Sequence, residues 1–374
     1  MKHKGLRFCF LILIFASIFA TSVFAAERDE TEDLRSFSGV DSLLELIPEG
    51  VDRESAQIFL EEKSVSGLFR RIADAFCSAF SFCLKESLGF FCGILAILIM
   101  GAVWSAFKES LSQSALQSAF DFLFLLILAT YSYSALESSF ALACQSLQTM
   151  NNFMLASLPF TTILLSMGGG LQAGAVQSAH LSFVLSFVSI LVSGYLLPIL
   201  RTLFALSLAG CFSDAGLGGL VSFFKRTVKV LCIFFFTLVS GILALQNALA
   251  AASDSLTLRS VRFAAGNFIP VVGSLVGESS KTLAASLKVV RTECGILCLG
   301  VLLFLLLRPI LCILVQKIFL ALAGAVGELL GEKKSQGLLK ALGEILDLLM
   351  ALLLSEGCYL VFYITLFLNN KGSF

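Results

Sequence analysis

Two acidic side chains of this sequence stand inside or beside long apolar runs. Glu356 lies near the middle of the run Ile345–Leu368, and Asp121 lies near the start of the run Leu116–Leu136. A central acid in a membrane span is unfavourable by about 3 kcal/mol, so it is by default a functional hypothesis. Glu356 is therefore the best candidate for a functional intramembrane carboxylate. The alternatives are a hydrogen bond to a neighbouring helix or a protonated carboxyl for Glu356, and a place at the headgroups for Asp121.

The stretch 254–295 combines charges, one proline and several glycines between two apolar runs. Its charged and chain-breaking positions are Asp254, Arg259, Arg262, Pro270 and Gly273. Non-helical backbone at membrane depth is tolerated only where protein or a water-filled cavity satisfies its polar groups. One interpretation is a broken connection buried at membrane depth. The other is an interfacial loop that re-enters the headgroup region.

A second interrupted element is 153–167, which contains Pro159 and is followed by Gly168, Gly169 and Gly170. It is short for a span and could be a re-entrant element or half of a discontinuous helix, a feature that lines transporter sites. The three glycines also open a formal G-x-G-x-x-A pattern. We reject a dinucleotide site because no strand precedes it and no βαβ unit surrounds it.

Several kinds of chemistry are missing from the sequence. There is no G-x-x-x-x-G-K-[ST] loop for ATP, and His180 is the only histidine outside the predicted signal peptide. The eleven cysteines lie largely in apolar runs without metal-ligand spacing, so we interpret them as small packing residues. We therefore expect no enzyme activity, no metal and no cofactor.

The composition is that of a membrane protein. Of the 374 residues, 57% are hydrophobic and 14% are charged, against about a quarter charged in soluble domains. The net charge of zero gives no electrostatic reason to expect nucleic-acid binding.

The amino-terminal part divides into two regions. Basic residues, an apolar core and a small-residue end at Ala25 predict a secretory signal peptide over 1–25, although an uncleaved anchor is the alternative. Residues 26–85 are acidic at first and then amphipathic, which predicts a small extracytoplasmic helical region. This region is either a cap on the membrane face or a docking surface for another protein.

Residues 86–370 form the predicted multi-pass membrane domain. The fold class is all-α, a polytopic helical membrane protein with about six to eight transmembrane helices, some broken or re-entrant. The basic cluster 225–229 is predicted to be cytoplasmic. Arg308-Pro309 interrupts an apolar run, which is one kinked helix or a tight hairpin. The glycine- and lysine-rich segment Glu328 to Lys340 is predicted to be cytoplasmic. The clearest predicted spans are Leu88–Ala106, Leu116–Leu136, Leu181–Leu200, Val230–Ala250 and Ile345–Leu368.

Two groups of motifs resemble a known family. The first runs from Leu245-Gln-Asn through 254–259 to Phe268-Ile-Pro-Val-Val-Gly273, and the second from Asn152-Phe-Met-Leu-Ala-Ser-Leu-Pro159-Phe to the three glycines. Together they are similar to the stage III sporulation protein AE family, over most of the chain from about residue 40. These motifs are structural and indicate no reaction.

The resemblance implies a membrane subunit of the sporulation channel or secretion-like complex that links mother cell and forespore. The implied location is the mother-cell-derived outer forespore membrane, with the amino-terminal domain extracytoplasmic. Implied partners are the other proteins of the stage III sporulation A operon, including a cytoplasmic ATPase, and indirectly a forespore membrane protein. The alternative is a stand-alone secondary transporter with a broken-helix substrate site.

The candidate positions are those with charge at membrane depth or with helix-breaking backbone. They are Asp121, Pro159, Gly168, Gly169, Gly170, Arg201, Asp254, Arg259, Arg262, Pro270, Gly273 and Glu356.

Overall fold

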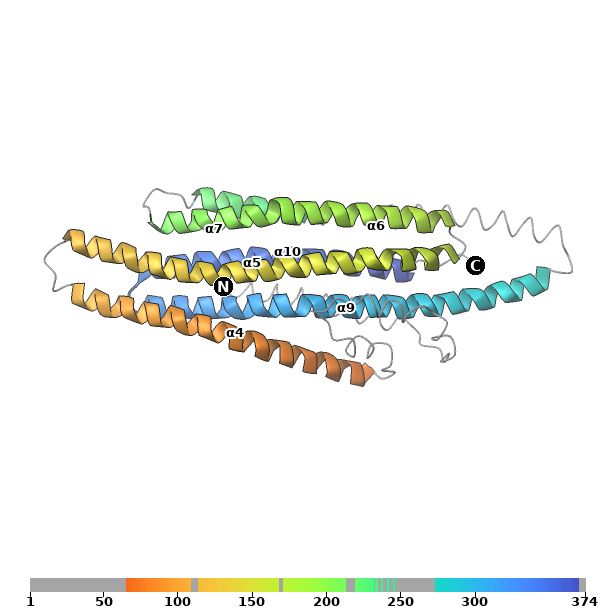
Figure 1. Ribbon diagram of the computed structural model, residues 1–374, viewed down its shortest axis with the longest axis horizontal. Coiled ribbons are helices and arrows are strands. Elements are labelled where there is room, and N and C mark those ends of the chain that lie inside the picture. Colours follow the sequence, from red (N-terminus) through yellow and green to blue (C-terminus); the bar gives the residue numbers. More distant parts are fainter. Residues whose placement is uncertain are drawn as a thin grey trace.

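The protein is a bundle of long helices that lie side by side along one axis (Figure 1). The computed structural model describes residues 65–108, 114–167, 171–212, 219–231 and 273–369, with five single positions between 233 and 245. Within these ranges the chain contains no strand. The named elements are α4 (Val65–Lys108), α5 (Ser114–Met167), α6 (Leu171–Leu191), η2 (Val192–Leu196), α7 (Leu197–Phe212), α9 (Gly273–Leu329) and α10 (Lys333–Asn369).

Five helical segments of the described residues are long and apolar enough to cross a membrane, which confirms the predicted all-α membrane fold. The prediction of six to eight spans covered the whole chain, and the predicted span Val230–Ala250 lies largely outside the described residues. The five segments are Phe76–Phe107, Gln117–Leu164, Ser182–Gly210, Cys294–Leu329 and Lys334–Thr365.

Helix α5 contains both the predicted span Leu116–Leu136 and the predicted interrupted element 153–167. It runs for 54 residues and contains Pro159, so 153–167 is its last part and no separate element. At 1.5 Å per residue the helix is about 80 Å long. A hydrocarbon core is about 30 Å thick, and even a 40° tilt accommodates only about 40 Å of helix. Part of α5 therefore extends beyond a single hydrocarbon core. Helix α4 likewise runs unbroken across the predicted domain boundary at 85–86, and that division stays a prediction.

Helix α9 is the centre of the bundle. It packs against α10, α4 and α5, and most of its apolar segment is buried, whereas that of α4 is mostly exposed. The outer faces of α4 and α5 carry exposed apolar side chains such as Met100, Phe107 and Phe122. This distribution is expected of a bundle whose outside is in contact with lipid.

Of the two interpretations of Arg308-Pro309, the single helix is confirmed and the hairpin is wrong, because α9 continues through Pro309. Proline has no N–H, so the carbonyl of residue i−4, here Leu305, loses its helical donor. The hydroxyl of Ser146 on α5 donates a hydrogen bond to that carbonyl oxygen at 2.9 Å. A neighbouring helix therefore satisfies the backbone group that the proline left unpaired, as a membrane interior requires.

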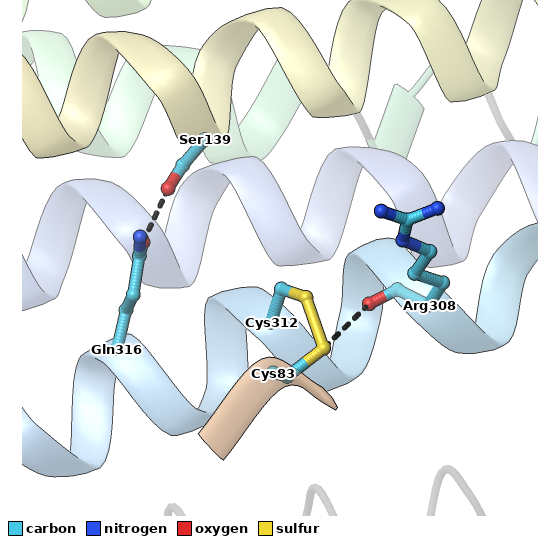
Figure 2. The surroundings of a disulfide bond; sticks show 5 residues. All are labelled: Cys83, Ser139, Arg308, Cys312 and Gln316. Carbon is cyan, nitrogen blue, oxygen red and sulfur yellow. Dashed lines mark hydrogen bonds between the residues drawn. A yellow bond between two sulfur atoms is a disulfide. The ribbon is translucent and has the colours of Figure 1, made fainter. Parts of the chain in front are cut away.

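A disulfide joins Cys83 of α4 to Cys312 of α9, across a sequence separation of 229 residues (Figure 2). The interpretation of Cys312 as a packing residue is therefore wrong. Both cysteines are buried, in a small core with Leu311, Val315 and Phe319. Spacing could not reveal the pair, since the partner of a distant cysteine depends on which helices pack together.

The segment α6–η2–α7 is one helical rod with a π-turn in the middle. Leu197 donates its backbone N–H to the carbonyl of Val192, five residues back. The π-turn lies immediately before Pro198, whose missing N–H disturbs the regular pattern at this place.

The connection between α9 and α10 is much shorter than the predicted segment 328–340. Gly331 has a φ of +81°, and Glu332 donates its N–H to the carbonyl of Gly327 at 2.9 Å. Together with the bond from Gly331 N–H to Glu328, these contacts form a Schellman cap that ends α9. Lys333 to Lys340 already belong to α10.

Candidate functional site

Glu356 lies on α10 inside the apolar segment Lys334–Thr365 and is almost completely buried, with 4% of its surface exposed. Its oxygen Oε1 has no hydrogen-bond partner among the described residues. A buried acid without full compensation is costly in the apolar interior of the bundle. Glu356 is thus the sequence candidate that the structure places most clearly at an unusual site.

Asn151 of α5 faces Glu356 from the neighbouring helix. Its side chain lies near enough to the Glu356 carboxyl to interact with it. Asn151 is also buried, and its oxygen Oδ1 has no partner among the described residues. Asn151 therefore brings an amide nitrogen donor and an amide oxygen acceptor into this buried region.

Tyr359 adds a third polar group. It follows Glu356 by three residues on α10, so the two side chains lie on the same face of the helix. Tyr359 is buried, and its hydroxyl has no partner among the described residues. We call Asn151, Glu356 and Tyr359 the Glu356 cluster.

Tight packing holds the helices together beside the Glu356 cluster. A Cβ atom at Gly357 would lie 2.3 Å from Cδ1 of Leu306 on α9, so glycine permits this close approach. The hydrogen bond from Ser146 to Leu305 joins α5 to α9 one residue away. Met150, Met154 and Leu302 belong to the surrounding apolar core.

A second set of polar contacts crosses the bundle about two and a half turns of α10 from Glu356. Lys317 of α9 forms an ion pair with Asp347 of α10. Next to Lys317, Gln316 accepts a hydrogen bond from Ser139 of α5 (Figure 2). Arg201 of α7 pairs with Glu137 of α5 at 2.9 Å, and Lys225 pairs with Glu344 at 2.7 Å. We call these eight residues the polar layer.

The polar layer is partly exposed on the outside of the bundle. The exposed fraction of the side chain is 52% for Arg201 and 39% for Glu137. Charged side chains in a membrane segment almost always face a bundle interior or a water-filled cavity. This face of α5 and α7 is therefore unlike the apolar outer faces of α4 and α5.

The other sequence candidates that the structure describes lie away from the Glu356 cluster. Asp121 lies half-buried near the start of α5, and Pro159 lies exposed in α5 two turns beyond Asn151. Arg201 belongs to the polar layer. Gly273 is the first residue of α9. The positions Gly168, Gly169, Gly170, Asp254, Arg259, Arg262 and Pro270, and the predicted signal peptide, lie outside the described residues.

Sequence reasoning missed Asn151, Tyr359, Lys317 and Glu137. Lys317 offered the clearest signal, because it is a charged residue inside the apolar run that follows Pro309. Asn151 offered little, since a polar residue between two apolar runs resembles a loop. Only the joining of those runs into α5 places it opposite Glu356.

The arrangement offers oxygen ligands and ion pairs, and we assign it no reaction. Among the residues that the structure describes, no group of three or more His, Cys, Asp or Glu side chains could hold a metal ion. The Glu356 cluster carries three buried oxygen atoms without a hydrogen-bond partner among the described residues, and the polar layer can fix neighbouring helices in register.

Comparisons with known proteins agree on one family. The family model of stage III sporulation protein AE matches residues 54–370. A Bacillus subtilis (strain 168) protein of that name is 26% identical over 245 residues, which is 65% of this chain and 59% of the relative. This chain therefore aligns with less than two thirds of the relative's length. No solved structure matches the chain.

Proposed function

Because the chain belongs to the stage III sporulation protein AE family, we propose that it is a membrane subunit of a channel or secretion-like complex linking mother cell and forespore. The observation that carries the proposal is the family match over 54–370, a range that contains all five apolar helices. A sporulation-related role and a membrane location follow from the family and the fold. The complex and its conduit are the proposed part.

The proposed location is the mother-cell-derived outer membrane around the forespore. The proposed partners are the other proteins of the stage III sporulation A operon, including a cytoplasmic ATPase, and indirectly a forespore membrane protein. The chain has no ATP-binding loop of its own, so an energy-consuming conduit would need such a partner.

The ends of the helices support an orientation. The C-terminal ends of α4, α7 and α9 and the N-terminal ends of α5 and α10 gather at one end of the bundle (Figure 1). Lys108, Lys334 and the cluster 225–229 belong to segments at or near these ends. Under the positive-inside rule this end is cytoplasmic. The N-terminal end of α4 then points outward, in keeping with an extracytoplasmic amino-terminal region.

The partly exposed polar layer favours a subunit over a solitary protein. Half-exposed charges such as Arg201 and Glu137 are poorly suited to contact with lipid tails, whereas a neighbouring protein or an aqueous path would accommodate them. The stand-alone transporter has less support, because α5 is continuous through Pro159 where a broken helix was expected.

The test is purification of the tagged full chain from sporulating cells in a mild detergent. We expect the proteins encoded beside it to co-elute, and the charge reversal Arg201→Glu to weaken this association. A substitution on an apolar outer face, Met100→Leu, is the matched control and should leave co-elution unchanged. A monodisperse chain that elutes alone and binds a small solute by itself would instead support the transporter.

A further inference from the structure

The helical segment 219–231 presents two exposed basic side chains, those of Arg226 and Lys229, on the outside of the bundle. They are three residues apart, so both lie on the same face of the helix. Val228 of the same segment is buried in the apolar core. This burial fixes which face of the segment points inward and leaves Arg226 and Lys229 on the outward face.

Arg226 and Lys229 differ from the other basic residues nearby, because those are paired. Lys225 pairs with Glu344 at 2.7 Å, and Arg201 pairs with Glu137 at 2.9 Å. No ion pair or hydrogen bond joins Arg226 or Lys229 to a residue that the structure describes. Within the described part of the chain, these two positive charges therefore have no counter-charge.

The sequence around the segment offers few acids that could supply one. Between residues 213 and 272, only Asp214 and Asp254 are acidic. The acidic amino-terminal region is predicted to be extracytoplasmic, whereas the basic cluster 225–229 is predicted to be cytoplasmic. The counter-charge for Arg226 and Lys229 is therefore best supplied by an anionic group from outside the chain.

Apolar side chains lie before and after the two cations on the same stripe of the helix. Phe223, Arg226, Val230 and Ile233 follow one another at helical spacing. The exposed fraction is 63% for Phe223, 56% for Val230 and 58% for Ile233. An outward face of this kind suits lipid, because a phospholipid carries a charged phosphate and apolar chains in one molecule. An acidic protein surface would match the two charges but not the apolar residues around them.

The depth of the two basic residues also fits the lipid headgroups. The predicted span begins at Val230, and Arg226 precedes it by four residues, or about 6 Å of helix. The headgroup region on each side of a hydrocarbon core is about 5–7 Å thick. Arg226 and Lys229 therefore lie within the headgroup layer, and the cytoplasmic leaflet is the one that carries anionic lipid.

We propose that Arg226 and Lys229 form a binding site for the phosphate of an anionic phospholipid, such as phosphatidylglycerol, in the cytoplasmic leaflet. The Arg226 guanidinium can donate two parallel N–H groups to phosphate oxygens, and Lys229 adds a second positive charge. The acyl chains of the lipid lie along Val230 and Ile233. The bound lipid supplies the counter-charge that the described residues lack.

The test uses the full chain purified in a mild detergent, with phosphatidylglycerol, phosphatidylcholine and inorganic phosphate as probes. Bound phospholipid is counted by native mass spectrometry, and the melting temperature Tm is followed as each probe is added. We expect saturable binding of phosphatidylglycerol with a rise in Tm, and neither effect with the other two probes. Arg226→Gln combined with Lys229→Gln should weaken this binding roughly thirtyfold, about fivefold for each basic residue.

Lys334→Gln combined with Lys340→Gln is the matched control, because it removes two exposed basic charges from α10. It should retain phosphatidylglycerol binding, as should the charge-preserving exchange Arg226→Lys with Lys229→Arg, which separates loss of charge from loss of folding.

Three results would overturn the proposal. The first is equal affinity for phosphatidylglycerol in the wild type and in Arg226→Gln with Lys229→Gln, or an equal loss in the α10 control. The second is an effect of inorganic phosphate as large as that of phosphatidylglycerol. The third is an acidic protein that co-purifies through Arg226 and Lys229 while the chain shows no preference for phosphatidylglycerol. Lipid binding is measured on the purified chain alone, so this proposal and the proposed function can fail independently.

Discussion

The hydrogen bond between Ser146 and the carbonyl of Leu305 predicts a specific energetic coupling to Pro309. Ser146→Ala removes the donor and leaves the carbonyl unpaired in an apolar core. Pro309→Ala returns a backbone N–H to α9 at the position that normally bonds to Leu305. Ser146→Ala should therefore destabilise the wild-type protein but have little effect in the Pro309→Ala background.

The expected size follows from the environment of the bond. Leaving a buried carbonyl unpaired costs about 1–3 kcal/mol in soluble proteins. Interhelical hydrogen bonds in membrane bundles average about 0.6 kcal/mol and reach about 1.7 kcal/mol. We expect Ser146→Ala to lower the free energy of unfolding by about 1 kcal/mol, and a coupling energy with Pro309→Ala of similar size.

The assay is reversible unfolding of the full chain by sodium dodecyl sulfate in mixed micelles. The single tryptophan, Trp104, packs against Phe120 at a ring-centroid distance of 4.1 Å, so its fluorescence reports separation of α4 from α5. Far-ultraviolet circular dichroism gives a second, global reading. Ser157→Ala is the matched control, because the Ser157 hydroxyl is buried on the same helix but bonds only to Met154, three residues back.

Two outcomes would refute the reasoning. If Ser146→Ala costs the same with proline or alanine at position 309, the hydroxyl does not compensate for the missing N–H. If Ser157→Ala costs as much as Ser146→Ala, loss of any buried hydroxyl explains the effect and the contact with α9 has no special role.

Three further predictions concern contacts between helices. Gly357→Ala should lower the free energy of unfolding by about 1–3 kcal/mol relative to Gly343→Ala, since only the first Cβ would overlap a neighbour; equal effects in the unfolding assay would contradict the close approach. Cys83→Ala should cost about 2–4 kcal/mol under oxidising conditions and nothing after reduction, and a cost that persists in reductant would assign it to packing. Arg201→Glu should lower Tm by an amount equivalent to about 1 kcal/mol, and adding Glu137→Arg should restore it; failure of the double reversal to restore Tm would show that the ion pair does not contribute.

Pro159 and Pro309, which both lie inside continuous helices, show the limit of prediction from sequence patterns. Pro159 and Arg308-Pro309 look like breaks, because proline removes a helical hydrogen bond in any sequence. Whether the helix continues depends on a compensating donor from elsewhere, and for Pro309 that donor is Ser146, far away in the chain. The sequence pattern could not distinguish a hairpin from a continuous helix, because the choice depends on the packing of α5 against α9.

The sequence alone determined the class of the protein and its most unusual residue. Long apolar runs with few charges can be stable only as helices in lipid, and an acid in the last run is conspicuous whatever surrounds it, so the membrane fold and Glu356 were both predictable. The family resemblance was likewise carried by short local motifs. The tertiary structure decided which residues meet: Asn151 with Glu356, Lys317 with Asp347, and Cys83 with Cys312. These pairs depend on the register and order of packed helices, which are set by side-chain fit between distant segments and leave no periodic signal in the chain.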